Sequence, residues 1–484
     1  MSKLPHRALA RLADRHGALM TVRLGTSLYV VASSPSAARE ILQTHNASLS
    51  GRSPADAWNG GGHGANSVFV LQPGRMWRTL RRIGTAHMLS PPRLQETLAL
   101  RRDAIRGLLR HVSQAAASGD TTVSVRRAAF TAMARLLWRA MFSGELDEDA
   151  SRGLYDSVRE AMVVVMMPNV SDLFPVLVAA DLQGVRRRMA ALIGKAYQLM
   201  DRQIDRRMEE RESGGGDGGS SDFLDAMLDM SELGDHSGVT INRDVIRAFC
   251  TVSMHDETSM VIQEQNLIDT LLSYGQLQDL FIAALDTTSN TIEWALAELL
   301  QNPQTMKTLQ DELRTVLGSK SQVEDSDIDK LPYLRAVVKE TLRLHSVVPL
   351  VSYRAEATVQ VQGYTIPQGS NVLVNVWAIH HNADVWAEPH KFLPERFLEK
   401  EAEFFGRNFE FIPFGSGRHI CLGLPLANKM LHAMLGSLLH QYEWKSPQHG
   451  SGDGVDMTEK YGLVLSMATP FHAIVKKKQH FGPV

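Results

Sequence analysis

Hydrophobic residues recur along this chain with two spacings, that of β-strands and that of amphipathic helices. The helical spacing extends over most of the sequence. Residues 20–33 alternate between apolar and polar side chains around a Gly-Thr-Ser turn, which predicts a β-hairpin. Short strands are predicted again within 350–375, where β-branched residues alternate with polar ones. Residues 76–89, most of 90–210 and the region before His345 show the spacing of amphipathic helices. We therefore expect a mainly α protein with small β-sheets.

Two Gly-rich segments interrupt the helical pattern. Residues 59–64 read Asn-Gly-Gly-Gly-His-Gly and predict a loop ahead of the helix over 76–89. Residues 213–221 consist of Gly, Ser and Asp, so they offer no apolar atoms whose burial would offset the entropy of ordering them. We interpret 213–221 as a flexible surface loop between helices in preference to a domain boundary, and we expect residues 1–484 to form a single domain.

Composition and charge narrow the function classes only slightly. The chain is 44% hydrophobic and 21% charged with a formal net charge of −2, so nothing draws it to nucleic acid, and no such partner is expected. The strongest apolar run, 161–167, is stopped by Pro168 and fits a core helix better than a membrane span. The first ten residues lack the apolar region of a signal peptide, so we expect no N-terminal membrane anchor.

The chemistry of the chain centres on one of its two cysteines. Cys250 and Cys421 are too few for a disulfide framework and suit a reducing compartment. Cys421 lies in Phe-Gly-Ser-Gly-Arg-His-Ile-Cys-Leu-Gly, residues 414–423, immediately before a predicted helix. Unpaired N–H groups and the helix dipole stabilise a thiolate there, and a thiolate is a strong soft ligand for iron. An isolated Cys-x-Gly is more often a buried structural cysteine, and the ten-residue context reverses that preference.

The neighbours of Cys421 suit a large flat cofactor. Gly423 and the earlier glycines of the loop let the backbone approach closely, and Arg418 places a cation near the cofactor's carboxylates. The helix that follows is amphipathic, with apolar residues at Ala427, Met430, Leu431, Met434, Leu435 and Leu438.

At each defining position, residues 414–423 resemble the haem loop F-x-x-G-x-R-x-C-x-G of the cytochrome P-450 superfamily. The resemblance implies the cytochrome P-450 fold, with haem b (iron protoporphyrin) held between a long central helix and the helix after the cysteine. It further implies that Cys421 is the axial iron ligand, that Phe414 and Gly423 belong to the cofactor-binding loop, and that Arg418 binds a haem propionate.

Other motifs of the same family stand where the resemblance requires them. Glu340 and Arg343, spaced to share one helix face, resemble the buried Glu-Arg pair of the family, with Arg396 as its third member and a role in folding. Trp77 and Arg81 resemble the Trp and Arg of the W-R-x-x-R-R helix in plant enzymes, which reach the haem propionates from one helix stripe.

Arg354 resembles a further propionate contact. The segment 283–288, Ala-Ala-Leu-Asp-Thr-Thr, resembles the oxygen-binding stretch A-G-x-D-T-T of the central helix. By that resemblance Asp286 relays protons from solvent and Thr287 donates a hydrogen bond to the bound dioxygen. Ala284 replaces the usual Gly, which narrows the space above the cofactor.

The resemblance covers essentially the whole chain and is closest to grass-type plant microsomal enzymes acting on terpenoids. It implies a monooxygenase that hydroxylates a small hydrophobic secondary metabolite with dioxygen, and NADPH–cytochrome P-450 reductase as the partner that supplies electrons, so that NADPH acts only indirectly. It also implies the cytosolic face of the endoplasmic reticulum membrane, although the anchor of such enzymes is not expected here. The predicted pocket walls are Ala57, Trp58, Val68, Ala283, Ala284, Val348, Leu350, Val351 and Leu463.

One departure from the family pattern leaves an alternative open. Residues 250–276 intervene where relatives run straight into the central helix, and this stretch is polar and weakly periodic. We interpret it as an insertion or a gene-model artefact. If it misplaces Asp286 and Thr287, the chain is a haem-binding but catalytically compromised product. A haem-thiolate isomerase or dehydratase that needs no reductase is a third reading, which the retained acid–alcohol pair disfavours.

Overall fold

The computed structural model describes residues 4–478 except 54, 60–67, 69, 118–121, 168, 214–221, 234–240, 242–244, 247–280, 400–401 and 448–453. Most of the first predicted Gly-rich loop, nearly all of the second and the whole suspected insertion at 250–276 therefore lie outside the described residues.

Within this part of the chain, the α-helices are α1 Pro5–His16, α2 Pro35–Arg39, α3 Arg75–Gly84, α4 Pro91–Glu96, α5 Leu98–Ala117, α6 Val125–Phe142, α7 Glu148–Val164, α8 Val170–Leu173, α9 Val185–Glu212, α10 Phe223–Leu233, α13 Phe281–Gln301, α14 Pro303–Leu317, α15 Pro332–Leu344, α16 Val376–His380, α17 Arg396–Glu399 and α18 Leu424–Gln441. Shorter 3₁₀ and π turns are η1 Glu40–Thr44, η3 Thr85–Leu89, η4 Pro175–Ala180, η6 Asp325–Lys330 and η7 Gly417–His419.

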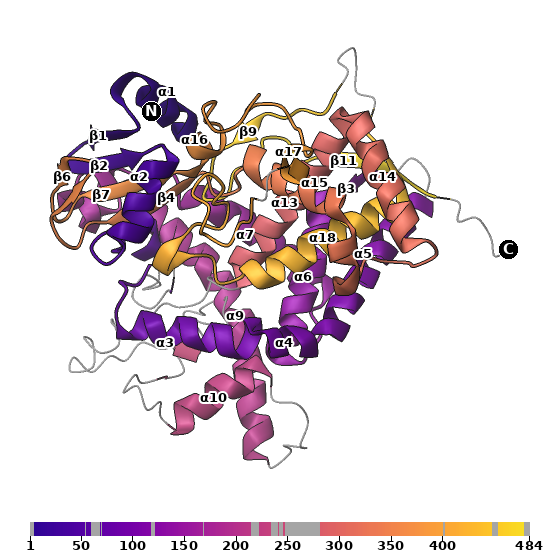
Figure 1. Ribbon diagram of the computed structural model, residues 1–484. Coiled ribbons are helices and arrows are strands. Elements are labelled where there is room, and N and C mark those ends of the chain that lie inside the picture. Colours follow the sequence, from indigo (N-terminus) through magenta and orange to yellow (C-terminus); the bar gives the residue numbers. More distant parts are fainter. Residues whose placement is uncertain are drawn as a thin grey trace.

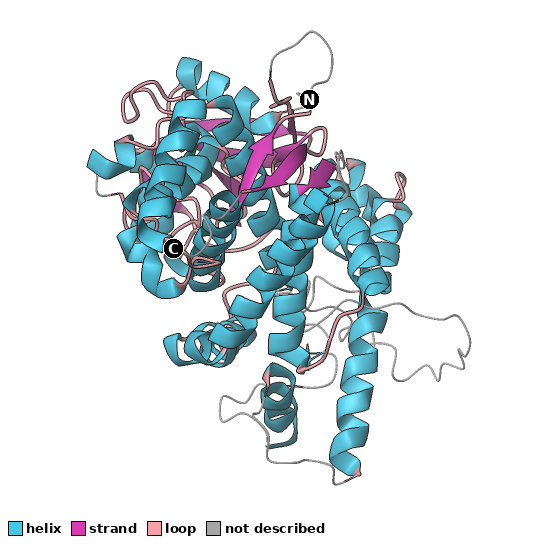
Figure 2. Ribbon diagram, turned by 90° about the vertical axis from the view of Figure 1, so that its right-hand side faces the viewer, coloured by secondary structure: helices cyan, strands magenta, loops and turns pink. Residues whose placement is uncertain are grey.

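The strands are β1 Leu19–Leu24, β2 Ser27–Ala32, β3 Thr122–Ser124, β4 Leu350–Arg354, β5 Val359–Val361, β6 Tyr364–Ile366, β7 Asn371–Asn375, β8 Tyr442–Lys445, β9 Glu459–Lys460, β10 Ser466–Met467 and β11 His472–Lys477. The mainly α composition with small sheets is as predicted from the spacing of apolar residues, and Figure 2 shows the strands gathered in a limited part of a largely helical molecule.

The largest sheet joins the N-terminal hairpin to two strands from residues 350–375. Its strand order is β1-β2-β7-β4, in which the predicted N-terminal hairpin pairs antiparallel, β2 runs parallel to β7, and β4 runs antiparallel to β7. Figure 1 shows the N-terminal elements lying beside β4, β6 and β7, which come more than 300 residues later. The sheet therefore fixes the start of the chain against the segment that leads to the cysteine loop.

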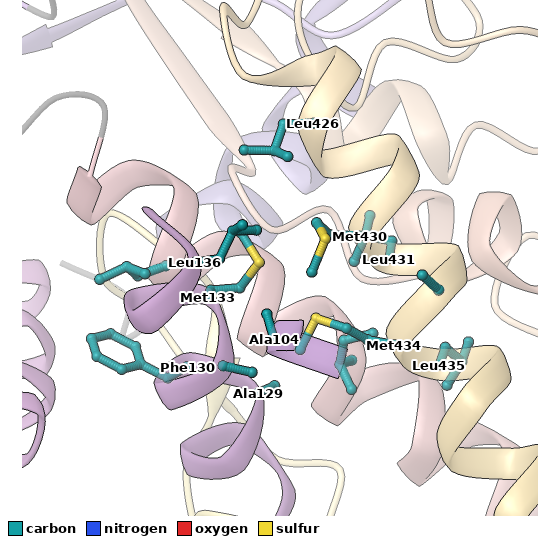
Figure 3. Packing of buried hydrophobic residues seen from close by; sticks show 14 of the residues in the cluster. Ala104, Ala129, Phe130, Met133, Leu136, Leu426, Met430, Leu431, Met434 and Leu435 are labelled. Atoms are coloured by element: carbon teal, nitrogen blue, oxygen red, sulfur yellow. The ribbon is translucent and has the colours of Figure 1, made fainter. Parts of the chain in front are cut away.

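The helical part is built around α13 and α18. These two helices contact each other, and α13 also packs against α6 and α15 while α18 packs against α5. Figure 3 shows Met430 and Met434 of α18 facing Met133 of α6 across a fully apolar space, with Ala104 of α5 filling the gap beside them. Of the apolar positions predicted for the helix after Cys421, α18 buries Met430, Leu431, Met434, Leu435 and Leu438, whereas Ala427 is half-buried.

Two helix starts explain how loops are tied to this core. Glu312 of α14 accepts hydrogen bonds from the Tyr333 and Leu334 N–H groups at the start of α15, at 2.7 and 2.9 Å. Asn375, the last residue of β7, accepts from the Ala378 N–H and caps α16. Side-chain oxygens satisfy N–H groups that the first helical turn leaves without partners. In the described part of the chain, no helix has the length and apolar character needed to cross a membrane.

Candidate active site

The cysteine loop is seated on the N-terminal part of the molecule. The Cys421 N–H donates to the Phe414 carbonyl at 2.9 Å, which closes the loop. Gly417 has a φ of +68°, and a Cβ there would collide with the carbonyl oxygen of Leu42 in η1. The sequence suggested that these glycines admit a cofactor; at position 417 the close neighbour is instead the protein's own backbone. His419 adds a bond to the Ser50 carbonyl at 2.8 Å.

Groups around Cys421 act on the protonation of its thiol in opposite directions. The residue is exposed, yet burial raises the pKa of its thiol, against the opposing effects of the Gly423 N–H, the Arg81 charge and the Leu424 N–H. The predicted contribution of the helix N–H groups is therefore present, and a metal cation on the sulfur would supply what is needed to hold it as a thiolate.

Helix α3 brings the predicted Trp and Arg to this loop. Arg81 Nη2 donates to the Ile420 carbonyl at 2.8 Å, one residue before the cysteine. The Arg81 guanidinium lies 5.2 Å from the centre of the Trp77 ring, and the Trp77 ring lies 4.9 Å from that of His419. Trp77 is buried, and its indole N–H has no hydrogen-bond partner among the described residues. A buried donor without a partner costs about 1–3 kcal/mol, so this one is expected to serve a ligand.

Positive charge converges on the same place. Burial and, after it, the charges of Arg52, Arg81 and Arg418 together lower the pKa of His419 to about 3, so all three guanidinium groups stand close to this ring. Neutral His419 then adds no charge of its own. Neither Arg52 nor His419 was predicted from the sequence as a site residue, because no local spacing marks them. An orphaned indole N–H beside converging guanidinium groups suits the carboxylate edge of a haem, and the residues present therefore fit this cofactor.

The other two arginines predicted to contact the propionates, Arg418 and Arg354, lie near this loop. Arg418 is exposed in η7. Arg354 is exposed at the end of β4, where its backbone pairs with Gly51, next to Arg52. Its Nη2 would lie 3.9 Å from a Cβ on Gly369, so the guanidinium points toward the turn before β7. The propionate role of Arg354 stays a prediction.

The acid and the alcohol of α13 point in different directions. Ala283, Ala284 and Thr287 are half-buried along one stripe, while the next residues of the helix are buried. Thr287 Oγ1 donates to the Ala283 carbonyl at 2.6 Å. Asp286 is only 1% exposed, and its Oδ1 accepts from Arg126 Nη2 of α6 at 2.6 Å. The sequence does not predict this arginine, which is itself buried and forms an ion pair with Asp286.

The predicted pocket walls divide among the three apolar clusters of the described chain. Ala57, Trp58 and Leu463 share one cluster with residues of α7 and α9. Val68 and Ala284 pack against the large helical core, and Val351 packs against the core under the sheet. Val348 and Leu350 are half-buried beside β4, as is Ala283 on α13. The structure therefore joins Ala57, Trp58 and Leu463 and places Val351 apart from them.

The Glu-Arg-Arg network forms as predicted. Glu340 Oε2 accepts from Arg343 Nε at 2.7 Å, and its Oε1 accepts from Arg343 Nη2 at 2.8 Å and Arg396 Nε at 3.2 Å. Glu340 and Arg343 are fully buried. Ser346 bonds to His380 Nδ1 at 2.8 Å and extends the same network.

Comparison with known proteins decides the family. The family model described as "Cytochrome P450" matches residues 1–472. The chain belongs to the cytochrome P450 family. It is 39% identical over 474 residues to a protein named geraniol 8-hydroxylase from Swertia mussotii, covering 97% of this chain and 89% of that protein. It is 36% identical over 478 residues to carnosic acid synthase from Rosmarinus officinalis, covering 97% and 88%.

Solved P450 structures confirm the fold. A zebra fish cytochrome P450 crystallised with progesterone superposes with a TM-score of 0.75 at 24% identity, covering 98% of this chain and 99% of that one. As a P450, this protein is a haem b monooxygenase, and the haem supplies the chemistry that activates dioxygen. Within the site described above, Cys421 is the residue that would bind the iron, and Trp77 and Arg81 would hold the carboxylate edge.

Proposed function

We propose that this P450 hydroxylates a terpenoid, with electrons from an NADPH-dependent cytochrome P450 reductase. The names of the relatives support the substrate class, since one hydroxylates geraniol and another makes carnosic acid. The apolar character of Ala57, Trp58 and Leu463 supports it further, because a hydrocarbon substrate needs apolar walls. The observation that carries the proposal is the assembly of Trp77, Arg81 and the cysteine loop into one charged, aromatic site.

Each site residue has a distinct task in this proposal. Cys421 holds the iron, and Trp77, Arg81 and Arg418 hold the propionates, with the charge of Arg52 close by at His419. Thr287, on the half-buried stripe of α13, turns its hydroxyl from the Ala283 carbonyl and donates a hydrogen bond toward the reacting oxygen, and Asp286 returns a proton to it. The overall reaction consumes one dioxygen, two electrons and two protons for each C–H bond hydroxylated and releases one water. The protein's remaining task is to hold that bond in place away from bulk solvent.

Reconstitution with haem and reductase tests the proposal. The reduced protein under carbon monoxide should give the absorption of a thiolate-bound haem, and geraniol should be oxygenated at the expense of NADPH. Cys421→Ser should abolish both signals, whereas Cys250→Ser, at the only other cysteine of the sequence, should retain both. A thiolate spectrum without oxygenation of any terpenoid tested would instead favour the catalytically compromised product. That alternative depends on residues 250–276, which the structure does not describe.

We further propose that the reductase docks over α3. Arg75, Arg78 and Arg82 are exposed along one side of this helix, while Trp77 on its other side faces the cysteine loop. A basic surface so close to the haem edge suits an acidic electron donor. The double variant Arg78→Glu and Arg82→Glu should raise the reductase concentration needed for half-maximal turnover about tenfold, an effect that salt should reduce. Arg152→Glu, at an exposed arginine of α7, should have no such effect.

Membrane association is proposed from an exposed apolar segment between α7 and α9. Val176 is 88% exposed, Leu182 63% and Phe174 42%, and three consecutive arginines follow at 186–188. Apolar side chains beside basic ones suit the surface of an anionic bilayer. Vesicles containing anionic lipid should bind the protein, and Val176→Asp with Leu182→Asp should weaken binding. Leu398→Asp, at an apolar residue that is 50% exposed elsewhere, provides the control.

A further inference from the structure

A buried cluster on α6 and α13 places one arginine between two carboxylates. Arg126 Nη2 lies 2.6 Å from Asp286 Oδ1, and Arg126 Nη1 lies 4.0 Å from Glu293 Oε2. The three side chains are 4%, 1% and 0% exposed. The other oxygen of Glu293, Oε1, accepts from the Phe471 N–H at 2.9 Å. Two negative charges and one positive charge cannot be neutral together, and burial raises the pKa of Glu293 to about 7.

The cluster is incompletely satisfied. Among the described residues, Arg126 Nε, Asp286 Oδ2 and Glu293 Oε2 have no hydrogen-bond partner. Buried ionised groups with free donor and acceptor positions are costly, so such positions are usually filled by water or are used in a reaction. Asp286 in particular has one oxygen bound to Arg126 and one oxygen free to take up a proton.

A small polar cavity leads to this cluster. It measures about 30 Å³, enough to hold water, and its polar lining residues are Arg126, Asp286, Arg159, Lys460, Tyr461 and Ser466. It lies between α7, α13 and the segment that begins at β9. Lys460 is exposed and Arg159 is half-buried, whereas Asp286 is buried. The cavity therefore extends from residues that solvent reaches to the carboxylate that solvent does not reach.

We propose that this cavity is the solvent-side proton inlet of the enzyme, and that Arg126, held between Asp286 and Glu293, is the positioning residue that keeps Asp286 at its inner end. The inference rests on the proposed relay through Asp286 and Thr287. A water in the cavity gives a proton to Asp286 Oδ2 and regains one from bulk solvent past Lys460. Protonation cancels the charge on Asp286, and Arg126 then retains Glu293 as its anionic partner. Asp286 then passes its proton toward Thr287, becomes an anion again and re-forms its ion pair with Arg126.

Proton delivery through this inlet competes with the release of hydrogen peroxide from the site. When protons arrive on time, two electrons from NADPH end in one alcohol and one water. When delivery to the distal oxygen is misdirected, the same two electrons and two protons leave as hydrogen peroxide and the substrate is unchanged. The ratio of peroxide to product therefore measures the inlet separately from the amount of folded enzyme.

Arg126→Lys tests the positioning role, with Arg127→Lys as the matched control. A lysine keeps the positive charge but cannot span Asp286 and Glu293. We expect the ratio of peroxide to product to rise at least fivefold in Arg126→Lys. Arg127 is the next residue of α6, is exposed, and lies over the Tyr155 ring at 5.9 Å, so its substitution should leave the ratio unchanged. A purely structural Arg126 would lower the yield of folded Arg126→Lys enzyme without moving the ratio.

Val163→Phe tests the inlet without touching a charged group. Val163 lines the cavity from α7, and a larger side chain fills it. We expect the peroxide ratio to rise and the solvent deuterium isotope effect on product formation to increase. A second readout needs no turnover: the infrared carbonyl band of the protonated buried carboxyl, identified by its loss in Glu293→Gln, should exchange in D₂O several times more slowly in Val163→Phe.

Thr287→Ala distinguishes failure of the Asp286–Thr287 relay from failure of the inlet. If Thr287→Ala uncouples the enzyme but Arg126→Lys and Val163→Phe leave the peroxide ratio and the exchange rate unchanged, the relay stands and the inlet is wrong. If none of the three moves the ratio, the relay itself is wrong. Arg159 and Tyr155 of α7 also face the cluster, and both variants leave them in place.

Discussion

Two buried clusters each pair arginine with carboxylate, one around Glu340 of α15 and one around Asp286 and Glu293 of α13. They differ in how many of their polar atoms have hydrogen-bond partners. In the first, both oxygens of Glu340 are bonded, and Arg343 also donates to the carbonyls of His380, Pro389 and Lys391. In the second, Arg126, Asp286 and Glu293 share one close contact and leave three atoms without a described partner.

The difference separates a structural network from one that is open to water. A fully bonded ionic network gains no further stability from water and holds one geometry. A partly bonded one beside a polar cavity keeps positions at which a proton can arrive. Buried charge alone is thus a poor guide to function in this protein, and the unfilled hydrogen-bond positions are the better one.

Glu340→Gln should have the largest effect on stability. It leaves Arg343 and Arg396 buried without their anion, which should lower the free energy of unfolding by about 3–5 kcal/mol. Chemical denaturation measures the change. Glu312→Gln is the control, because Glu312 accepts two N–H bonds at the start of α15 but pairs with no arginine there, and a lost cap should cost about 1 kcal/mol. Equal losses in the two variants would contradict the importance of the saturated ion pair.

Glu293→Gln should change how stability depends on pH. The pKa of Glu293 is about 7 in the folded protein against an ordinary value of 4.5. The folded state therefore binds more protons than the unfolded state between these values, and stability falls as pH rises through this window, by roughly 3 kcal/mol in all. The glutamine variant should lack that fall.

The comparison of Glu293→Gln with wild type isolates this term, because the buried neutral histidines titrate equally in both proteins. Denaturation midpoints across the window measure it. Glu298→Gln serves as the control, since Glu298 lies on the same helix but pairs with His345 at 2.7 Å. A parallel pH profile for Glu293→Gln and wild type would show that the half-satisfied cluster is as fixed as the saturated one.

Trp77→Phe should lower the affinity for haem, because it removes a buried N–H group that has no hydrogen-bond partner in the described protein. Its indole N–H is buried without a described partner, so the haem-free protein should lose little stability. Haem affinity should fall by about 1.5–3 kcal/mol, the contribution of a hydrogen bond to a charged group, which is roughly 10- to 100-fold. Haem transfer to apomyoglobin measures the change. Trp138→Phe removes a similarly unpartnered indole N–H in the α6 core and should leave haem affinity intact.

Ser346→Ala should have the smallest effect. It removes the hydroxyl that bonds to His380 Nδ1, while His380 Nε2 still accepts from the Ile412 N–H at 3.0 Å. A loss of about 1 kcal/mol is expected in thermal unfolding. A much larger loss would mean that the saturated network depends on its outermost member.

The sequence predicts what local spacing can encode. The hairpin over 20–33, the helix after Cys421 and the Glu340–Arg343 pair all follow from residues within one or two turns of one another. The family motif then places Trp77 and Arg81 beside the cysteine loop, and the structure has Arg81 bonded to Ile420 there.

Contacts between distant segments that no motif marks were beyond prediction. Arg126 and Asp286 are 160 residues apart, and an arginine at the start of a helix is more often exposed than buried. Gly417 was attributed to the cofactor, but its neighbour is Leu42, because only the folded chain shows that η1 passes beneath the loop. The orientation of Asp286 was missed for the same reason: its partner comes from another helix.

The attachment of His419 to Ser50 has a consequence for how the enzyme is made. These residues are 369 positions apart, and Arg81 and Ile420 are 339 apart. At ribosomal speeds of about 5–20 residues per second, the early half of the cofactor's binding surface waits roughly 20–70 seconds for the late half. The two segments can therefore meet only late in synthesis, and a cofactor held between them would be bound among the last events of biogenesis.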